Sequence, residues 1–295
     1  IRQTIVDKGW IKGIISLPPN LFYGTGIPAC ILVIDKEGAE NRAGIFMIDA
    51  GKGYVKDGSK NRLREKDIYR IVTTFNEQIT TDPKYARFVP NKEIKEKNGY
   101  NLNISRYIDS SDPEDIQDIY AHIHGGIPVA DIDALERFWT AFPTLKNELF
   151  GVFSEGYYKL NVEEDVIRQT TYSNAEFVVY GEMIDEAFAS WKSYADSKLK
   201  NLKAGVSAKK LIIELAQAIL KEFESLSLIN KYDVYQVLLA YWNEVLSDEV
   251  SLIISDEAGY GVARETENIM KETKKKDDDG NPELKVAGWE GKLIP

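Results

Sequence analysis

Three short apolar runs in the first fifty residues predict β-strands. They cover about residues 11–17, 27–35 and 43–49. Continuous apolar runs of this length, bounded by proline and glycine, are typical of strands that are covered on both faces, as in a parallel sheet. A helical pattern over residues 1–8 precedes them, and Gly9 suits the C-terminal cap of that helix. The alternation of helix and strand predicts an α/β unit.

The links between the three runs predict how the strands connect. Pro18 and Pro19 cannot donate to a strand ladder, so the first strand has to end near Leu17. The segment from Lys36 to Arg42 is polar and contains a glycine. This pattern predicts a hairpin that joins the second strand to the third.

The rest of the chain divides at a cluster of turn-forming residues. A helix is predicted from Asp67, as its N-cap, to about Phe75, and residues 85–89 and 94–107 complete the first unit. Ser110-Ser111-Asp112-Pro113 then mark a boundary. The predicted domains are therefore an α/β region over residues 1–110 and a mainly helical region over residues 111–295.

Helical periodicity dominates the second region. Three stripes of apolar residues carry it: Ile184, Phe188 and Trp191; Ile212, Leu215, Ile219, Phe223 and Leu226; Val234, Leu238, Tyr241 and Val245. Leu239, Trp242 and Leu246 add a second apolar face to the last helix, which we therefore expect to be buried on two sides. The charged stretch Lys274–Gly280 predicts a solvated loop.

An aromatic pair follows the first strand directly. Phe22 and Tyr23 lie just beyond Pro18 and Pro19, and thus just beyond the carboxyl end of a predicted strand. Open α/β sheets bind their ligands at that end. The loop that carries the pair is therefore the first candidate for a binding site.

Two motifs in this region carry a family resemblance. Leu17-Pro18-Pro19-Asn20-Leu21-Phe22-Tyr23-Gly24-Thr25-Gly26-Ile27-Pro28 precedes an apolar run, and Tyr100-Asn101-Leu102-Asn103-Ile104-Ser105-Arg106-Tyr107-Ile108 follows later. The first 110 residues thereby resemble the modification (methyltransferase) subunit of type I restriction–modification systems. That resemblance implies a site-specific, adenine-specific DNA methyltransferase that uses S-adenosylmethionine. It also implies the C-terminal part of a Rossmann-like methyltransferase sheet, closed by an antiparallel strand and followed by a mainly α-helical region.

Two motifs of that family are missing from these residues. A glycine-rich cofactor loop and the catalytic Asn-Pro-Pro-Phe do not occur, Pro18-Pro19-Asn20 has the wrong order, and no strand is predicted before Gly259-Tyr260-Gly261. In the family, both motifs lie before the segment that opens this chain. We therefore expect a fragment without catalytic residues of its own and without methyl transfer on its own.

The resemblance assigns roles to the aromatic loop. A base flipped out of DNA loses its stacking, and an aromatic ring restores part of it. Phe22 is the expected stacking residue, with Tyr23 in reserve, and the structural alternative is that Phe22 plugs the end of the sheet. Asn20, Thr25 and Gly26 are expected in the loop of the base pocket, or only as residues that shape its turn.

The basic residues after the third strand form the most DNA-like patch of the chain. The residues expected on the DNA backbone are Lys52, Lys56, Lys60, Arg62 and Arg106. Arg64, Lys66 and Tyr54 lie in the same stretch. Simple solvation is an equally good interpretation of the patch. Arg106 could contact a phosphate. An equally good interpretation of this segment is that Asn101 and Asn103 cap and buttress their loop.

The remaining candidate chemistry points away from catalysis. Cys30, the only cysteine, lies in a predicted buried strand and is interpreted as a small core residue. His122 and His124 could ligate a metal from a strand, but the local pattern is helical and predicts a histidine near a helix end before Gly125. We therefore expect no metal site.

Composition limits the partners. The net charge of −10 is unusual for a protein that binds DNA on its own. It fits a subunit that meets DNA at one edge and mainly binds proteins, which the resemblance identifies as a specificity subunit and a restriction subunit. The sequence contains no apolar run long enough for a membrane helix, and it contains a single cysteine. Both features predict a cytoplasmic location.

Two alternatives to a methyltransferase part stay open. The chain could be a non-catalytic assembly module that docks a DNA-specificity subunit through Trp191, Tyr241 and Trp242. It could also belong to a single chain that fuses a nuclease with a methyltransferase.

Overall fold

The computed structural model describes residues 1–111, 117–255, 264–276 and 282–293. The chain divides into two compact units. Unit 1 comprises Ile1–Thr170 together with Asn230–Gln236, and unit 2 comprises Thr171–Ile229 together with Val237–Pro295. The boundary predicted at residue 110 stays a prediction, because Asp112 and Pro113 lie outside the described residues.

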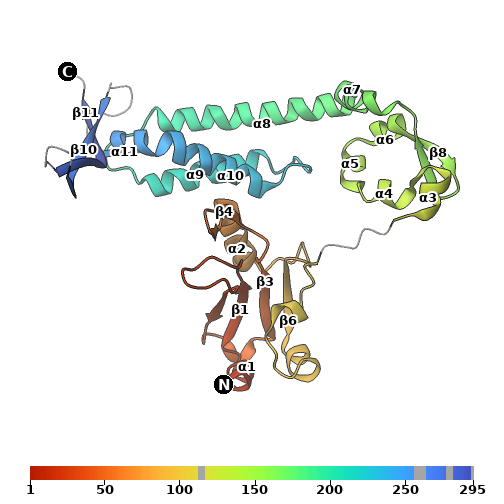
Figure 1. Cartoon of the computed structure of the whole chain (residues 1–295), viewed down its shortest axis with the longest axis horizontal. Helices are drawn as coiled ribbons and strands as arrows, with labels where there is room; N and C mark the ends of the chain where they lie inside the picture. The colour runs from red at the N-terminus through yellow and green to blue at the C-terminus, as the bar shows by residue number, and fades with distance from the viewer. Residues whose placement is uncertain (112–116, 256–263, 277–281, 294–295) are drawn as a thin grey trace. The chain divides into compact units, whose positions relative to one another are not determined.

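A four-stranded mixed sheet forms the centre of unit 1, in the order β2-β1-β3-β6. Its strands are β1 (Ile11–Ser16), β2 (Cys30–Ile34), β3 (Gly44–Asp49) and β6 (Ala86–Pro90). Strand β1 is parallel to β3 and antiparallel to β2, and β3 is antiparallel to β6. Figure 1 shows β1, β3 and β6 side by side. The predicted α/β class is thus confirmed.

Alternate residues of the central strands enter two different cores. Ile14 and Met47 belong to the layer that α1 (Arg2–Asp7) covers through Val6. Ile15 and Phe46 belong to the opposite layer, under α2 (Glu65–Glu77). Because successive side chains of a strand point to opposite faces, a strand covered on both sides has to be apolar throughout. The apolar runs therefore predicted β1 and β3 correctly.

Strand β2 departs from this prediction. Leu32 lies opposite Ile14 and Ile31 opposite Ile15, so β2 continues both apolar layers. Most of its side chains are nevertheless exposed: Ile31 to 46%, Leu32 to 50% and Ile34 to 55%, while Val33 is partly buried. Cys30 is exposed as well, so the interpretation as a buried core cysteine is wrong. The physical reason is position, because within the described residues β2 is the edge of the sheet and pairs with β1 alone.

The predicted hairpin between the second and third strands is also wrong. Strand β1 lies between β2 and β3, so the two do not pair. Their connection contains the short 3-10 helix η1 (Ala39–Asn41). Arg42 fixes it by donating to the carbonyl oxygens of Asp35 at 2.7 Å and Glu37 at 3.1 Å, and also to that of Gly9.

The helix ends follow from their local sequences. Gly9, with φ +64°, follows α1 as predicted. Helix α2 begins after Arg64, and Asp67 is its third residue rather than its N-cap. The Asp67 carboxylate accepts a hydrogen bond from the Arg64 backbone nitrogen at 2.9 Å. A side chain at this position satisfies a backbone donor just as an N-cap does, which explains why the sequence signal was displaced by three residues.

The remaining elements of unit 1 are short. Between β3 and α2 lies the hairpin of β4 (Val55–Asp57) and β5 (Lys60–Arg62). The π-helix η2 (Glu93–Lys97) and the 3-10 helix η3 (Ile104–Arg106) follow β6. The next elements are α3 (Ile119–His124), β7 (Ile127–Pro128), α4 (Val129–Asp133), α5 (Glu136–Ala141), α6 (Pro143–Leu149), β8 (Phe150–Ser154), β9 (Tyr157–Leu160), η4 (Glu164–Val166) and α7 (Ile167–Ser173), which extends past residue 170. The three-stranded sheet β7-β9-β8 was not predicted, since the sequence indicated helix there.

Unit 2 is built from helices, as the apolar stripes predicted. They are α8 (Ala175–Leu199), α9 (Ala208–Glu222), α10 (Lys231–Tyr241), which begins in unit 1, the π-helix η5 (Trp242–Leu246) and α11 (Ser247–Ser255). Trp191 of α8 is buried and donates from Nε1 to the carbonyl oxygen of Leu215 at 3.0 Å. The strands β10 (Arg264–Lys276) and β11 (Pro282–Leu293) pair at the C-terminal end. The loop predicted over 274–280 is thus strand as far as Lys276, and its other residues lie outside the described ones.

The helical segment of α10 and η5 is buried on a single side only. Leu238, Leu239 and Trp242 are buried, but Tyr241 is 51% and Val245 48% exposed. The prediction of burial on two sides is therefore wrong. In the part of the chain that the structure describes, no helix combines the length and apolar character needed to cross a bilayer.

Candidate nucleic-acid interface

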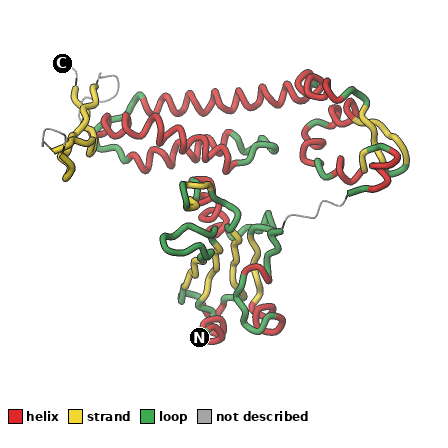
Figure 2. The backbone as a smooth tube through the Cα atoms, viewed as in Figure 1, coloured by secondary structure: helices red, strands yellow, loops and turns green. Residues whose placement is uncertain are grey.

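The aromatic loop, residues 17–29, leaves the sheet where β1 and β3 end together. The two strands are parallel, and Ser16 pairs with Asp49 at their last position. The Ser16 hydroxyl donates to the Asp49 carboxylate at 2.6 Å, which links the two strand ends. The loop therefore begins at the carboxyl end of a parallel strand pair, the place that the sequence predicted. Figure 2 shows it as a long green segment beside the yellow strands.

The aromatic pair is presented to solvent. Phe22 is 53% exposed and Tyr23 is 94% exposed. In contrast, Pro18 is fully buried and Leu21 packs against the apolar layer under α2. The loop is thus anchored at its base and carries its rings outward. Phe22 is therefore not enclosed in either apolar layer of the sheet, and its stacking role stays a prediction.

The three other loop candidates shape the backbone. Asn20 has φ +56° and Gly24 has φ +80°, both in the left-handed region that glycine and asparagine tolerate best. The Thr25 hydroxyl accepts a hydrogen bond from the Ile27 backbone nitrogen at 3.1 Å. A Cβ on Gly26 would lie 3.1 Å from the Asn20 Oδ1 atom, so glycine leaves room for that side chain. All three residues therefore have a local structural role.

The β4–β5 hairpin holds the loop from the side. The Asn61 Nδ2 atom donates to the carbonyl oxygen of Pro19 at 2.7 Å. The Asn61 backbone nitrogen donates to the carbonyl oxygen of Asn20 at 3.0 Å, and the Lys60 ammonium donates to that of Phe22 at 2.8 Å. The Lys60 ammonium also lies 5.9 Å from the centre of the Tyr23 ring. Residues about 40 positions apart in the sequence therefore form one structure.

Asn61 is the residue that sequence reasoning missed. It is only 4% exposed, and its Oδ1 atom has no hydrogen-bond partner within the described residues. A buried amide oxygen without a partner costs about 1–3 kcal/mol. The sequence offers only a weak signal, a neutral amide between Lys60 and Arg62.

The basic candidates are dispersed along several elements. Arg62 lies 3.4 Å from Asp57, Arg64 pairs with Asp67 at 2.8 Å, and Lys66 pairs with Asp233 at 2.6 Å. Lys52 and Lys56 are exposed. Carboxylates therefore accompany Arg62, Arg64 and Lys66. The role of Lys52, Lys56, Lys60 and Arg62 on the DNA backbone stays a prediction.

Arg106 lies apart from the hairpin, in η3, and is exposed. The Asn101 Oδ1 atom accepts from the Asn103 backbone nitrogen at 3.0 Å, and the Tyr107 hydroxyl donates to the Asn101 carbonyl oxygen. Asn101 thus buttresses its loop, as one of the two interpretations predicted. The backbone-binding role of Arg106 stays a prediction.

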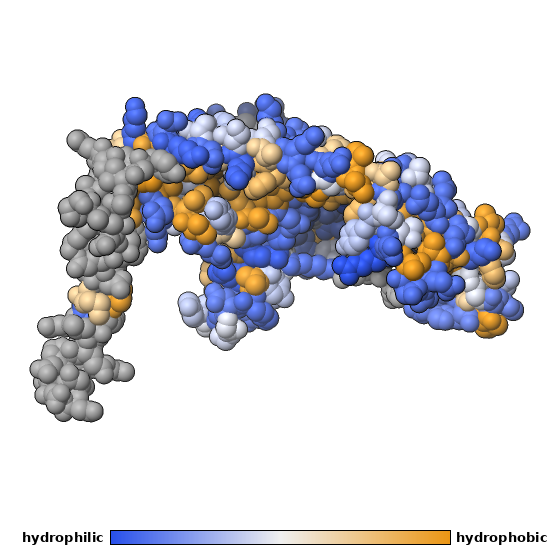
Figure 3. Space-filling model, turned by 90° about the horizontal axis from the view of Figure 1, so that it is seen from above, coloured by the Kyte–Doolittle hydropathy of each residue, from blue (hydrophilic) through white to orange (hydrophobic). Residues whose placement is uncertain are grey.

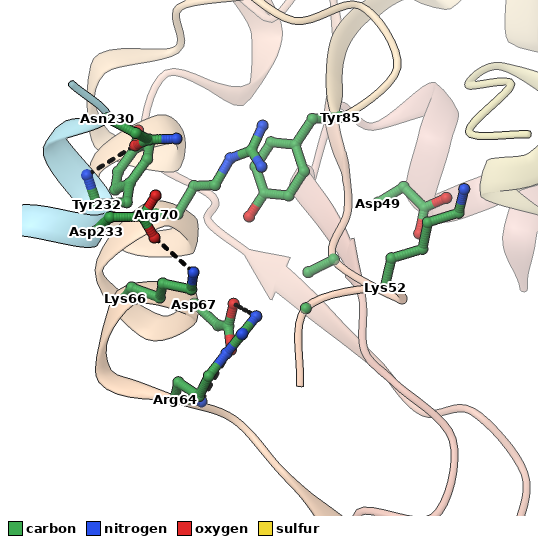
Figure 4. A pocket seen from close by; sticks show the side chains of 12 residues that line it. Asp49, Lys52, Arg64, Lys66, Asp67, Arg70, Tyr85, Asn230, Tyr232 and Asp233 are labelled. Atoms are coloured by element: carbon green, nitrogen blue, oxygen red, sulfur yellow. Dashed lines mark hydrogen bonds and ion pairs between the residues drawn. The ribbon is translucent and has the colours of Figure 1, made fainter. Parts of the chain in front are cut away.

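A cavity of about 220 Å³ lies next to the strand ends, within unit 1. Figure 4 shows Arg70 over the ring of Tyr85 and the ion pairs Arg64–Asp67 and Lys66–Asp233 in its wall. The Arg70 guanidinium is 3.6 Å from the Tyr85 ring centre, and burial raises the pKa of the Tyr85 hydroxyl far above its ordinary value. Tyr85 is therefore a neutral hydrogen-bond donor at any physiological pH.

Asp49 brings a charge to the same cavity. Burial by itself raises the pKa of its carboxyl, but hydrogen bonds from Ser16, Ser110 and Gly51 and the charge of Lys52 outweigh that effect. The pKa of Asp49 is therefore lowered from 3.8, and the carboxylate is ionised at neutral pH.

These residues do not fit S-adenosylmethionine. The strand ends that could face a cofactor continue into Pro18-Pro19 and into Asp49-Ala50-Gly51, neither of which is a glycine-rich loop that opens a helix. The cavity beside them is lined by paired charges. Within the described residues, these strand ends therefore present an aromatic surface without a glycine-rich cofactor loop.

The two histidines lie on α3, so they do not share the face of a strand. The His122 Nε2 atom lies 2.9 Å from Gln117 Oε1, and the His124 ring is 4.4 Å from that of Tyr120. The predicted helix end before Gly125 is confirmed. Within the described residues no group of three metal-ligating side chains comes together.

Comparison with known proteins shows what the N-terminal region is similar to. The family model of N-6 DNA methylases matches residues 1–116. The methylase subunit of the type I restriction enzyme MpnII from Mycoplasma pneumoniae is 33% identical over 131 residues, which are 44% of this chain and 24% of that protein. The methylase subunit of the type I restriction enzyme MjaVII from Methanocaldococcus jannaschii is 38% identical over 112 residues, 37% of this chain and 19% of that protein.

A crystal structure provides a further comparison. The type I restriction-modification system methyltransferase subunit from Streptococcus thermophilus has 32% sequence identity and a TM-score of 0.34, and the alignment covers 38% of this chain and 23% of that chain. The chain thus spans about a quarter of the length of the curated relatives that it matches. The resemblance to type I methylase subunits that the two motifs indicated is confirmed over the N-terminal region.

Proposed function

We propose that this chain is part of a DNA methyltransferase that methylates the exocyclic amino group of adenine in a type I restriction–modification system. The observation that carries the proposal is the exposed Phe22 on a loop at the carboxyl end of β1, within the segment that matches N-6 DNA methylases. Its role is to stack on the adenine after that base leaves the duplex.

The physics of base flipping explains why an exposed ring is useful here. An adenine in a duplex cannot present its amino group to a methyl donor, so it has to rotate out of the stack. Stacking on an aromatic side chain recovers about 1–3 kcal/mol per base. Phe22 supplies such a ring without first having to leave a core, because half of its surface is already accessible. Tyr23 stands next to it as a second ring.

The four-stranded sheet is then the closing part of a larger Rossmann-like sheet. Both apolar layers of the sheet continue on β2 without cover, as Leu32 and Ile31 demonstrate. An exposed edge with apolar side chains on both faces invites a further strand and its helices. S-adenosylmethionine and the acceptors of the adenine amino group belong to that larger part, and the chain alone transfers no methyl group.

The partners of the proposed protein are DNA, a specificity subunit and a restriction subunit, in the cytoplasm. With a net charge of −10, phosphate contacts have to come from local cations. The candidates are the exposed Lys52, Lys56 and Arg106, with Lys60 and Arg62 on the hairpin beside the aromatic loop.

The test is replacement of Phe22 by alanine in the assembled methylase that contains this chain. Loss of about 1–3 kcal/mol of stacking lowers the methylation rate about 5- to 150-fold, with unchanged assembly. The fluorescence of 2-aminopurine at the target position falls as the flipped base is less populated. Phe88→Ala is the matched control, since Phe88 is 41% exposed on β6 and far along the chain from the loop. Equal methylation by the Phe22→Ala and wild-type enzymes would refute the proposal.

A second candidate function rests on a different observation. Val237, Tyr241 and Val245 are spaced by four residues and are 69%, 51% and 48% exposed, which forms an apolar stripe on α10 and η5. Figure 3 shows groups of hydrophobic residues among hydrophilic ones on the face that it draws. On this reading the chain is an assembly module that docks a specificity subunit through Tyr241. Trp191 and Trp242, the other residues expected there, are buried and so are not part of that surface.

Tyr241→Lys separates the two functions. It weakens binding of the specificity subunit if the stripe is a docking surface, and leaves the stacking of adenine by Phe22 unaltered in the complexes that still form. Loss of assembly together with normal methylation by Phe22→Ala would favour the assembly module. A nuclease activity on the same polypeptide would instead identify the third alternative, a fused nuclease–methyltransferase.

A further inference from the structure

The aromatic loop is held by hydrogen bonds from another part of the chain. Residues 17–29 contain no helix or strand. Three carbonyl oxygens within four residues, those of Pro19, Asn20 and Phe22, instead accept hydrogen bonds from Asn61 and Lys60. Every donor is on the β4–β5 hairpin, and every acceptor is on the loop.

The hairpin is itself a defined structure. Asp57 pairs with Lys60 across a two-residue turn, and Gly58 occupies the first position of that turn with φ +59°. Glycine at this position is typical of tight hairpins. Asn61 lies in the short second strand, so its backbone nitrogen and its side chain are held in a fixed relation to each other. The hairpin can thus impose a conformation on a loop that has no ladder of its own.

The burial of Asn61 indicates what its side chain is for. The residue is 4% exposed, one amide atom is bonded to Pro19, and the other has no partner within the described residues. A leucine of similar size would fill the same space without an unpaired polar atom. The contribution of the amide is therefore specific to the loop carbonyl that it holds, rather than to the packing of the core.

We infer that the β4–β5 hairpin positions the aromatic loop and that Asn61 is its positioning residue. The expected effect on methylation rests on the proposed function, because Asn61 acts on methylation only through the rings of Phe22 and Tyr23. It does not touch the base. A loosened loop still contains Phe22, but the ring spends less time where a flipped adenine would stack on it.

Chymotrypsin measures the positioning directly on the 295-residue chain. It cleaves after aromatic residues, and cleavage after Phe22 and Tyr23 requires local opening of the loop. In Asn61→Leu, the rate of cleavage at these two positions rises about tenfold, because a hydrogen bond to Pro19 no longer opposes opening. Ser59→Ala is the matched control: Ser59 is exposed at the tip of the same hairpin and has no bond to the loop among those described. Mass spectrometry of the fragments identifies the cleaved bonds.

A second variant keeps the test independent of folding. Lys60→Met retains the aliphatic stem and removes only the ammonium that donates to Phe22. It also raises cleavage after Phe22, to a smaller extent because Lys60 is half-buried, while amide exchange of β3 stays at the wild-type rate. Wild-type cleavage in both variants would overturn the inference.

The assembled methylase then distinguishes this inference from the proposed function. Asn61→Leu lowers the methylation rate, and it adds nothing further in combination with Phe22→Ala, since it acts through that ring. If Phe22→Ala leaves methylation unchanged while Asn61→Leu still opens the loop, the proposed function fails and the positioning role stands. If the two substitutions reduce methylation independently of each other, Asn61 has a role other than positioning Phe22.

Discussion

Strands β2 and β3 are both short and apolar, yet their surroundings differ completely. In β3 the side chains of Ile45, Phe46, Met47 and Ile48 are at most 2% exposed. In β2 the side chains of Ile31, Leu32 and Ile34 are about half exposed. The difference lies in the neighbouring strands, since among the described residues β3 has a strand on each side and β2 has a strand on one side.

The sequence of a strand therefore reflects the environment to which it is suited. That environment can differ from the one that the described residues provide. Strands at a solvated edge usually carry charges, prolines or polar alternation. Strand β2 has none of these, and its two faces prolong the two cores of the sheet. Its composition is that of an interior strand, which agrees with the proposal of a larger sheet.

The largest expected effect is in the interior strand. Ile48→Ala removes a fully buried side chain from the layer under α2. Deletion of buried aliphatic groups lowers the free energy of unfolding by about 2–5 kcal/mol. Urea unfolding of the 295-residue chain, followed by amide exchange of β1 and β3, measures the change. A cost below 1 kcal/mol would mean that β3 is not packed as the structure has it.

The same substitution in the edge strand should have a far smaller effect. Ile34 is 55% exposed, so Ile34→Ala lowers the free energy of unfolding of this chain by less than about 1 kcal/mol. In the assembled methylase the cost rises towards that of Ile48→Ala, because the proposed larger sheet buries the side chain. An equal, small cost in both settings would argue that β2 remains an edge.

The smallest effect concerns the polar link at the end of the β1–β3 pair. The pKa of Asp49 is lowered from 3.8 in the folded chain. A lowered pKa adds stability that is fully present above the unfolded value and is lost as the pH falls through the folded one. The free energy of unfolding therefore declines below about pH 4, and Asp49→Asn removes that part of the decline. Parallel pH profiles of the two proteins would show that Asp49 carries no such stabilisation.

Much of the sheet could be predicted because a strand that is buried on both faces has a continuous apolar sequence. The bounds of β1 and β3 follow from apolar runs that end at Pro18 and at Asp49. The pairing of β2 could not be predicted, because an apolar run does not specify which neighbour it joins. Local signals placed Gly9 correctly, but they put the start of α2 three residues too late, because a carboxylate satisfies the same backbone donors from the N-cap or from the third helical position.

The candidate site was predictable only in its exposed part. Phe22 and Tyr23 stood out as rings on a proline-bounded loop, and their exposure agrees with that prediction. Asn61 did not stand out, since its role depends on a contact 42 residues away in the sequence. The basic residues looked like one patch in the sequence, but Asp57 and Asp67 accompany Arg62 and Arg64 in space.

The bonds from Asn61 and Lys60 to the aromatic loop also bear on how such proteins can recombine. Residues 17–29 and 55–62 are separate in the sequence but are joined by hydrogen bonds in the structure. A chimaera that transplants the first stretch alone places it against a foreign support. Only an exchange of both stretches together carries the geometry across, which makes the pair, rather than either motif, the natural unit for grafting.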